Sequence, residues 1–258
     1  MKRIDKQKEL IIDQFTKQSV TFSGIPGHSG DITLRCLTSL ISIANTDVVL
    51  DVACGPGIFT CAIAPLAKQV TGIDLVPAML EKAKSLQAEK KIENINWDIG
   101  DVMPLPYADS SFSIVVTRYS FHHFMNPGAV LSEMTRVAKK QGKVVVIDVF
   151  TVSQEQSRAY DSIEKMRDPS HVHTLPLDSL QGLFKKAGLI NATSKFYHVE
   201  IDLEQQIKAS FPKESDIPII RKAALDDIGK DQLGWGAFLK EGKVCLSLPI
   251  AVIAGEKV

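Results

Sequence analysis

The stretch at residues 48–60 constrains the fold most, because it joins a strand to a glycine turn and a helix. Except for Asp51, residues 48–52 are apolar and mostly β-branched, which is typical of a parallel strand covered on both faces. Gly55 and Gly57 lack a Cβ, so the backbone can turn sharply there and a ligand can approach it closely. The first N–H groups of the following helix point into the same space. This arrangement predicts a site for an adenosine-containing ligand at the carboxyl edge of an α/β sheet.

Length and charge limit the classes of protein that fit this sequence. The chain has 258 residues, which suits one α/β core with additional segments. Lys plus Arg and Asp plus Glu number 30 each, and zero net charge argues against a broad nucleic-acid or membrane-surface footprint. The four cysteines form no CxxC pair, and no signal peptide or apolar run of spanning length is visible. We expect a cytoplasmic protein that acts on a small molecule. The sequence does not determine its oligomeric state, and a homodimer is one possibility.

Strands and helices alternate through the middle of the sequence, which predicts a parallel sheet covered on both faces. Residues 1–45 are expected to form an N-terminal helical cap, residues 46–150 the ligand-binding core, and residues 151–258 the rest of the same fold with lid helices. The expected strands are residues 48–52, 70–74, 95–99, 113–117, 144–150, 190–201 and 244–254. The expected helices are residues 1–22 (before a loop at 23–30), 31–43, 58–66, 77–90, 127–139, 153–167, 177–187 and 203–228, the last with breaks at Pro212 and Pro218.

The residues around the turn distinguish between adenosine ligands. A dinucleotide-binding turn has a third glycine three residues after the second, and Thr60 stands there instead. The Gly-Lys-Ser/Thr of a phosphate-binding P-loop is absent as well. Each of the first three expected strands has an acid at or near its end. Asp51 and Asp74 lie in the first and second strands, and Asp101 follows the third. A carboxylate at a strand end can accept hydrogen bonds from both ribose hydroxyls, and three acids without a basic phosphate clamp favour a cationic ligand.

At these residues the chain resembles class I S-adenosylmethionine-dependent methyltransferases in motif, order and spacing. Residues 117–124 are most similar to the ubiquinone/menaquinone methyltransferase-like branch, although the N-terminal motif of the quinone enzymes is missing, which argues against a quinone acceptor. The resemblance implies a Rossmann-like, doubly wound sheet of seven strands with an antiparallel last strand. It also implies methyl transfer to an O, N or C atom of a small organic molecule. The matching segments are residues 51–57, 72–80, 100–112 and 136–142.

The resemblance also implies which part of the cofactor each matching residue would contact. The glycine turn would face the methionine part, with Asp51 near its ammonium group, and Asp74 would hold the ribose hydroxyls. Leu75 and Met79 would flank the adenine, and Arg118 would lie beside the cofactor after the fourth strand. Asp101, with the Val102 backbone, would contact the adenine edge. The full set of cofactor residues is Asp51, Cys54, Gly55, Gly57, Asp74, Leu75, Met79, Gly100, Asp101, Val102 and Arg118.

Histidines are the candidates for catalysis. A sulfonium is already a good leaving group, so the protein mainly aligns donor and acceptor, and a general base helps when the acceptor must lose a proton. His122 and His123 follow the fourth strand, and His171 lies on a presumed lid. Each is either a base or substrate contact, or a packing group. Phe15 and Phe22 could shield the sulfonium from water or simply pack, and nothing in the sequence requires a metal.

Two other functions are compatible with the same fold. A nicotinamide-dependent oxidoreductase would bind a dinucleotide, and Thr60 in place of the third glycine argues against it. A protein that binds S-adenosylmethionine without transferring methyl, such as a cyclase or a regulatory module, would share all the cofactor residues.

Overall fold

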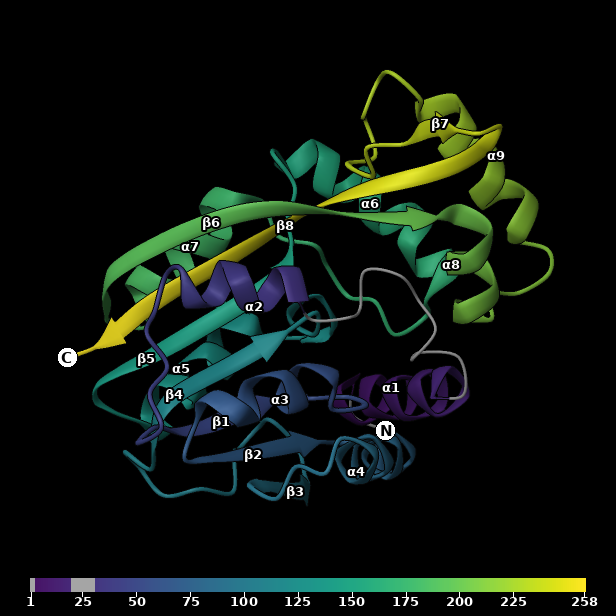
Figure 1. Ribbon diagram of the computed structural model, residues 1–258. Coiled ribbons are helices and arrows are strands. Elements are labelled where there is room, and N and C mark those ends of the chain that lie inside the picture. The colour runs from purple at the N-terminus through teal and green to yellow at the C-terminus, as the bar shows by residue number, and fades with distance from the viewer. Residues whose placement is uncertain (1–2, 20–30) are drawn as a thin grey trace.

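Figure 1 shows the computed structural model of the chain, which describes residues 3–19 and 31–258. Phe22 and the predicted loop at residues 23–30 lie outside the described residues. One twisted sheet crosses the molecule, with helices on both of its faces. The strands are β1 (Val48–Val52), β2 (Gln69–Asp74), β3 (Ile95–Ile99), β4 (Phe112–Arg118), β5 (Ala138–Val149), β6 (Leu189–Asp202), β7 (Phe238–Lys240) and β8 (Lys243–Lys257).

Helix ends follow the local chemistry of the sequence. The Ser153 side chain caps α6 by accepting a hydrogen bond from the Gln156 N–H at 3.1 Å. Pro218 lies in the first turn of α9, where proline is favoured, and therefore starts this helix rather than breaking it. The expected helix at 31–43 ends earlier, at Thr38. The helices are α1 (Arg3–Gln18), α2 (Asp31–Thr38), α3 (Ile58–Ile63), α4 (Pro77–Glu89), α5 (Pro127–Val137), α6 (Gln154–Arg167), α7 (Leu177–Lys186), α8 (Leu203–Ser210) and α9 (Ile217–Asp227).

The sheet has the order β3-β2-β1-β4-β5-β8-β6, and β7 pairs with β8. β1 to β5 are parallel, whereas β8 runs antiparallel to both of its neighbours, β5 and β6. This confirms the predicted Rossmann-like sheet with an antiparallel last strand. β7 is a short additional strand that was not expected from the sequence. It forms a hairpin with β8 through Glu241 and Gly242, both at positive φ (53° and 78°), as a two-residue type I′ turn requires.

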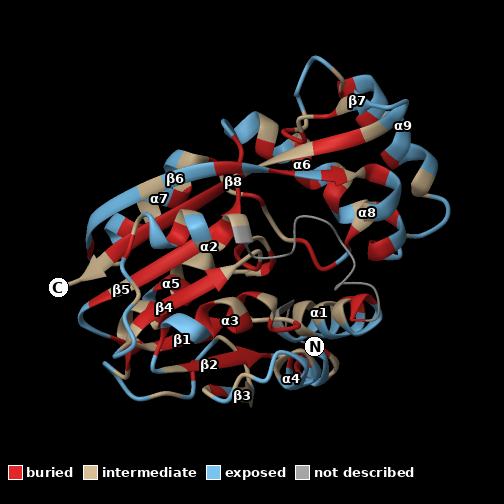
Figure 2. Ribbon diagram, viewed as in Figure 1, coloured by how far each residue is buried: buried red, intermediate tan, exposed pale blue. Residues whose placement is uncertain are grey.

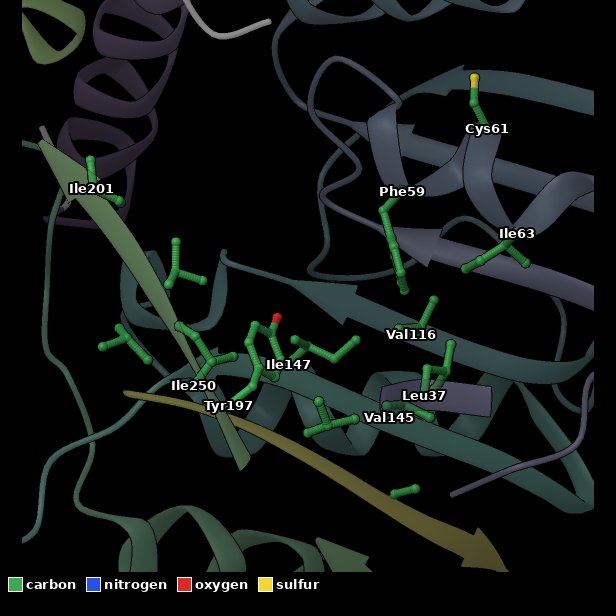
Figure 3. Packing of buried hydrophobic residues seen from close by; sticks show 14 of the residues in the cluster. Leu37, Phe59, Cys61, Ile63, Val116, Val145, Ile147, Tyr197, Ile201 and Ile250 are labelled. Atoms are coloured by element: carbon green, nitrogen blue, oxygen red, sulfur yellow. The ribbon is translucent and has the colours of Figure 1, made fainter. Parts of the chain in front are cut away.

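The central strands bury side chains on both faces, as parallel strands with helices on either side do. In β4, Val116 belongs to a cluster on the face covered by α2 and α3, and Val115 belongs to a second cluster with α5 and α7. Figure 3 shows the first cluster, which Leu37 of α2 and Phe59 of α3 share with Val116. Figure 2 shows the buried strands between helices with exposed outer faces. Among the described helices, none is long and apolar enough to cross a membrane.

Helices gather at the carboxyl ends of the strands, where α1 contacts α4 and α8 (Figure 1). Side-chain amides of α1 fix its position. Gln7 Nε2 donates to the Ser170 carbonyl at 2.6 Å, and Gln14 Nε2 donates to the Ser210 carbonyl at 2.6 Å. Because these bonds join the N-terminal helix to segments far away in the sequence, α1 covers the end of the sheet where the ligand is expected. The division at residues 45 and 150 stays a prediction.

Two glycines of the β1–α3 turn should differ in their tolerance of a side chain. Both have positive φ, so alanine at Gly55 should lower the free energy of unfolding by about 1–2 kcal/mol. A Cβ at Gly57 would also lie 2.5 Å from Trp97 and 2.8 Å from Ala83, whereas nothing lies within 4 Å of one at Gly55. We expect Gly57→Ala to cost a further ~1–3 kcal/mol through overpacking. Urea titrations of both variants measure the difference, and equal losses would contradict this packing role.

Candidate active site

A cavity of about 460 Å³, called the main cavity below, lies at the carboxyl ends of β1, β2 and β4. α1 lines its outer side through Gln7, Lys8, Ile11 and Phe15, and the first three had no predicted role in the site. An amphipathic helix can be predicted from its apolar spacing, but the surface it covers cannot. The predicted cofactor residues that line the main cavity are Asp51, Cys54, Gly55, Asp74, Leu75, Met79, Asp101, Val102 and Arg118.

Two predicted cofactor residues, Gly57 and Gly100, are absent from the described lining of the main cavity. At Gly57 the space for a side chain is filled by Trp97 and Ala83, and at Gly100 an added Cβ would lie 2.9 Å from Ile73. Both glycines therefore let neighbouring elements pack closely around the cavity. Cys54 does line it, and burial raises the pKa of its thiol well above the usual value, so the thiol stays protonated.

Asp51 is buried at the end of β1 and accepts a hydrogen bond from the Thr60 hydroxyl at 2.6 Å. Thr60 occupies the position of a dinucleotide-binding glycine, so here the side chain at that position orients the acid. Burial raises the pKa of Asp51 to about 7, although the Thr60 hydrogen bond and the charge of Arg118 oppose the shift. A cationic group beside Asp51 would favour its ionised form.

Asp74, at the end of β2, joins the two turns that form the floor of the main cavity. Its Oδ2 accepts from the Gly55 N–H at 2.7 Å, and its Oδ1 accepts from the Val76 N–H at 2.9 Å. A carboxylate has about four acceptor sites, so two remain for other donors. Burial raises the pKa of Asp74 while these backbone hydrogen bonds oppose that rise.

Asp101 forms an ion pair with Lys8 of α1 and accepts a hydrogen bond from the Met103 N–H at 3.2 Å. The ion pair holds the N-terminal helix over this end of the main cavity. Lys8 therefore pairs with one oxygen of the carboxylate that was predicted to contact the adenine amine. The contact between Asp101 and adenine stays a prediction.

Arg118 is the last residue of β4 and stacks its guanidinium on aromatic rings. Its Cζ lies 4.2 Å from the centroid of the Tyr119 ring and 5.5 Å from that of Phe59. Nε and Nη2 are buried, and neither has a hydrogen-bond partner among the described residues. Buried polar groups are nearly always paired in folded proteins, so these nitrogens are suited to an acceptor supplied by a ligand.

A second cavity, of about 100 Å³, shares Phe15, Tyr119 and His123 with the main cavity. Tyr119 has φ = 55°, a left-handed backbone that a residue other than glycine rarely adopts and that is enriched at functional sites. His122 lines the second cavity, and its Nδ1 lies 2.6 Å from Oδ1 of Asp148 in β5. The two cavities therefore meet beside the histidines that follow β4.

The two neighbouring histidines have opposite pKa shifts. Burial lowers the pKa of His122, but the charge and hydrogen bond of Asp148 more than offset this, so the net shift is upward. Burial and the charge of His122 lower the pKa of His123 to about 4. His123 is therefore neutral at pH 7, and its Nδ1 lies 3.0 Å from the Ser170 carbonyl.

His171 is buried close to these two histidines and is not among the described residues that line either cavity. Its Nε2 lies 2.7 Å from Oδ1 of Asp161, whose other oxygen lies 2.5 Å from Nδ1 of His173. The His171 ring centroid is 5.5 Å from that of His122, so the two rings are in contact. Across the described segments, no group of three or more His, Cys, Asp or Glu residues could hold a metal ion.

Comparison with known proteins agrees with this fold. A family model described as a methyltransferase domain matches residues 50–146. The uncharacterized methyltransferase YcgJ of Bacillus subtilis is 30% identical over 161 residues, which are 62% of this chain and 64% of that protein. The crystal structure of YcgJ superimposes with a TM-score of 0.79 at 24% identity, covering 89% of this chain and 98% of the other.

A second relative belongs to the branch that the sequence resembles. The demethylmenaquinone methyltransferase of Deinococcus radiodurans is 37% identical over 102 residues, which are 39% of this chain and 42% of that protein. In sequence, the chain thus spans less than two thirds of the length of either curated relative. The part that the family model matches begins within β1 and contains Asp51, the turn after it and β2 to β4. Residues 50–146 of this chain are thus similar to a methyltransferase domain, both in the family model and in these two relatives.

Proposed function

We propose that the protein transfers a methyl group from S-adenosylmethionine to an O, N or C atom of a small organic molecule. The observation that supports this most is the placement of Asp51, Asp74 and the unpaired Arg118 around one cavity. S-adenosylmethionine carries an ammonium group, a ribose diol and a carboxylate, and the three side chains are complementary to these groups in that order.

The contacts of each side chain support its proposed role. Asp51, oriented by Thr60, would accept a hydrogen bond from the ammonium group. Asp74 keeps two acceptor sites for the two ribose hydroxyls after binding the Gly55 and Val76 N–H groups. The unpaired nitrogens of Arg118 would donate to the carboxylate of the methionine part.

The chemistry is a displacement at the methyl carbon. An electron pair of the acceptor forms the new bond to the methyl carbon as the carbon–sulfur bond breaks. The electrons of the broken carbon–sulfur bond stay on sulfur and neutralise the sulfonium. Holding donor and acceptor in line can lower the barrier by roughly 7–11 kcal/mol. Where the acceptor atom carries a proton, His122 would remove it. Asp148 holds His122 by Nδ1, which leaves Nε2 to act as the base.

The same geometry ranks the three predicted catalytic histidines. His123 touches both cavities but is a weak base, because burial holds its pKa near 4. His171 is separated from both and would position His122 rather than contact the substrate. The second cavity has a small volume, on the order of one aromatic ring, which supports a small-molecule acceptor. The four cysteines are free, which supports a cytoplasmic location.

Two measurements test the proposal. Calorimetry should detect binding of S-adenosylhomocysteine, and incubation with S-adenosylmethionine and a panel of phenols, amines and enols should then release S-adenosylhomocysteine. Lack of binding at millimolar concentration would refute the proposal. Binding without turnover on any acceptor would favour the alternative of a fold that retains the cofactor without transferring methyl.

Cofactor binding near pH 7 should release protons. Asp51 has a pKa of about 7 in the unliganded protein and is therefore partly protonated, and a neighbouring ammonium group would lower that pKa. We expect Asp51 to release about half a proton per bound S-adenosylhomocysteine at pH 7. Calorimetry in two buffers of different ionisation enthalpy measures the release, and Asp51→Asn should reduce it. A wild-type protein that releases none would show that Asp51 does not meet the ammonium group.

Replacing the proposed base should slow catalysis without weakening cofactor binding. We expect His122→Gln to reduce kcat by roughly 10²–10⁴-fold on an acceptor that loses a proton, with unchanged affinity for S-adenosylhomocysteine. Because a base must be neutral, wild-type activity should rise with pH through a pKa above 6.5. His198→Gln, on the exposed side of β6, is the matched control. Unchanged kcat in His122→Gln would exclude His122 as the base.

A further inference from the structure

The second cavity is positioned to hold the methyl acceptor. Phe15, Tyr119 and His123 separate it from the main cavity, so an occupant would lie directly beside the bound cofactor. Its apolar lining comes mainly from β6 and β8, and much of its polar lining comes from α6 and the residue after it. The apolar residues of these strands are Val199, Ile201, Leu248 and Ile250, and the charged or titratable residues include Glu164, Arg167, Asp168, Asp148 and His122.

Buried carboxylates outnumber cations around the second cavity. Asp148, Glu164 and Asp168 are buried, and the cationic groups that line the cavity are Arg167 and, when protonated, His122. Burial raises the pKa of Glu164, but the charge and hydrogen bonds of Arg167 lower it overall, so Glu164 stays ionised. Charges interact more strongly when removed from water, so this imbalance disfavours any occupant with a negative charge.

Arg167 is not available to compensate such an occupant, because its three nitrogens all have partners. Nε donates to both Glu164 oxygens at 3.1 Å, Nη2 pairs with the same carboxylate, and Nη1 donates to the Ser210 hydroxyl. Asp168 is also held as a carboxylate, since it accepts from the Ser170 N–H at 2.8 Å and from the Ser170 hydroxyl at 2.5 Å.

Hydrogen-bond acceptors remain in the second cavity. Oε1 of Gln206, on α8, is buried and has no hydrogen-bond partner in the described chain. This oxygen can only accept, so it requires a donor from an occupant. Nε2 of His122, whose Nδ1 is bound to Asp148, is a second acceptor when the ring is neutral.

We propose that the second cavity selects a small methyl acceptor that carries O–H or N–H donors and no negative charge, such as a phenol or an amine. This inference rests on the proposed function, and it adds the acceptor class. One donor would be held by Gln206 Oε1, and the reacting O–H or N–H would face His122. In the reaction the new bond to the methyl carbon replaces the O–H or N–H bond. The proton passes to His122, and S-adenosylhomocysteine leaves as the neutral thioether.

Single-ring probes of equal size test the selection on protein saturated with S-adenosylhomocysteine. Catechol and benzylamine carry donors without negative charge, and benzoate carries the negative charge. We expect ligand-observed NMR titrations to give a dissociation constant roughly tenfold or more higher for benzoate than for either of the others. Catechol and benzylamine also show whether a neutral or a cationic donor is preferred. Equal affinity for benzoate, or no binding of any probe to the loaded protein, would overturn the inference.

A charge variant should change this selection in a defined direction. Glu164→Gln leaves Arg167 without its carboxylate partner, so benzoate affinity should rise about tenfold while S-adenosylhomocysteine affinity stays the same. Glu155→Gln, on the exposed surface of the same helix, should change neither. Should Glu164→Gln fail to fold, Gln206→Leu serves instead and should weaken catechol about threefold or more. Unchanged probe affinities in the folded variant would contradict the inference. If the wild-type protein does not bind S-adenosylhomocysteine, the proposed function itself is refuted.

Discussion

The buried carboxylate of Asp74 is the interaction on which the site depends. It binds the N–H of Gly55 in one turn and that of Val76 in the next, so it holds two strand ends in one arrangement. This is possible because β1 and β2 are adjacent and parallel, with Val52 paired to Ile73. The pairing brings Asp51 and Asp74 to the same edge of the sheet. Both acids are buried there, and burial raises the pKa of each, so a ligand that contains cationic and hydroxyl groups relieves the cost of that burial.

The sheet was largely predictable, and so was the edge of it where most of the proposed cofactor residues line the main cavity, because both depend on local patterns. β-branched apolar runs predict buried parallel strands, and an acid after such a run lies at a known edge of the sheet. The β7–β8 hairpin was missed because Glu241 takes a left-handed conformation that glycine, asparagine or aspartate usually takes in such turns. The length of α2 was overestimated, since apolar spacing continues beyond Thr38 although the helix does not.

The second cavity could not be predicted, because its residues meet only through tertiary contacts. α6 has the sequence of a polar surface helix, yet Glu164 is buried and Arg167 nearly so. Polar residues are usually exposed, and no local pattern indicates when three carboxylates converge. The histidines show the same limit. His122 and His123 are neighbours in sequence, and only the structure distinguishes the one that faces Asp148 from the one enclosed beside Phe15. The contacts of each ring, more than its position in the chain, determine its chemistry.

In the proposed function, the main cavity holds the cofactor with its sulfur directed toward the second cavity. A crystal structure of the chain with S-adenosylhomocysteine tests this directly. We expect the ribose hydroxyls on Asp74, the ammonium group on Asp51, and the sulfur at the boundary formed by Phe15, Tyr119 and His123. A ligand whose sulfur lies away from this boundary, or whose ribose does not contact Asp74, would contradict this placement of the cofactor.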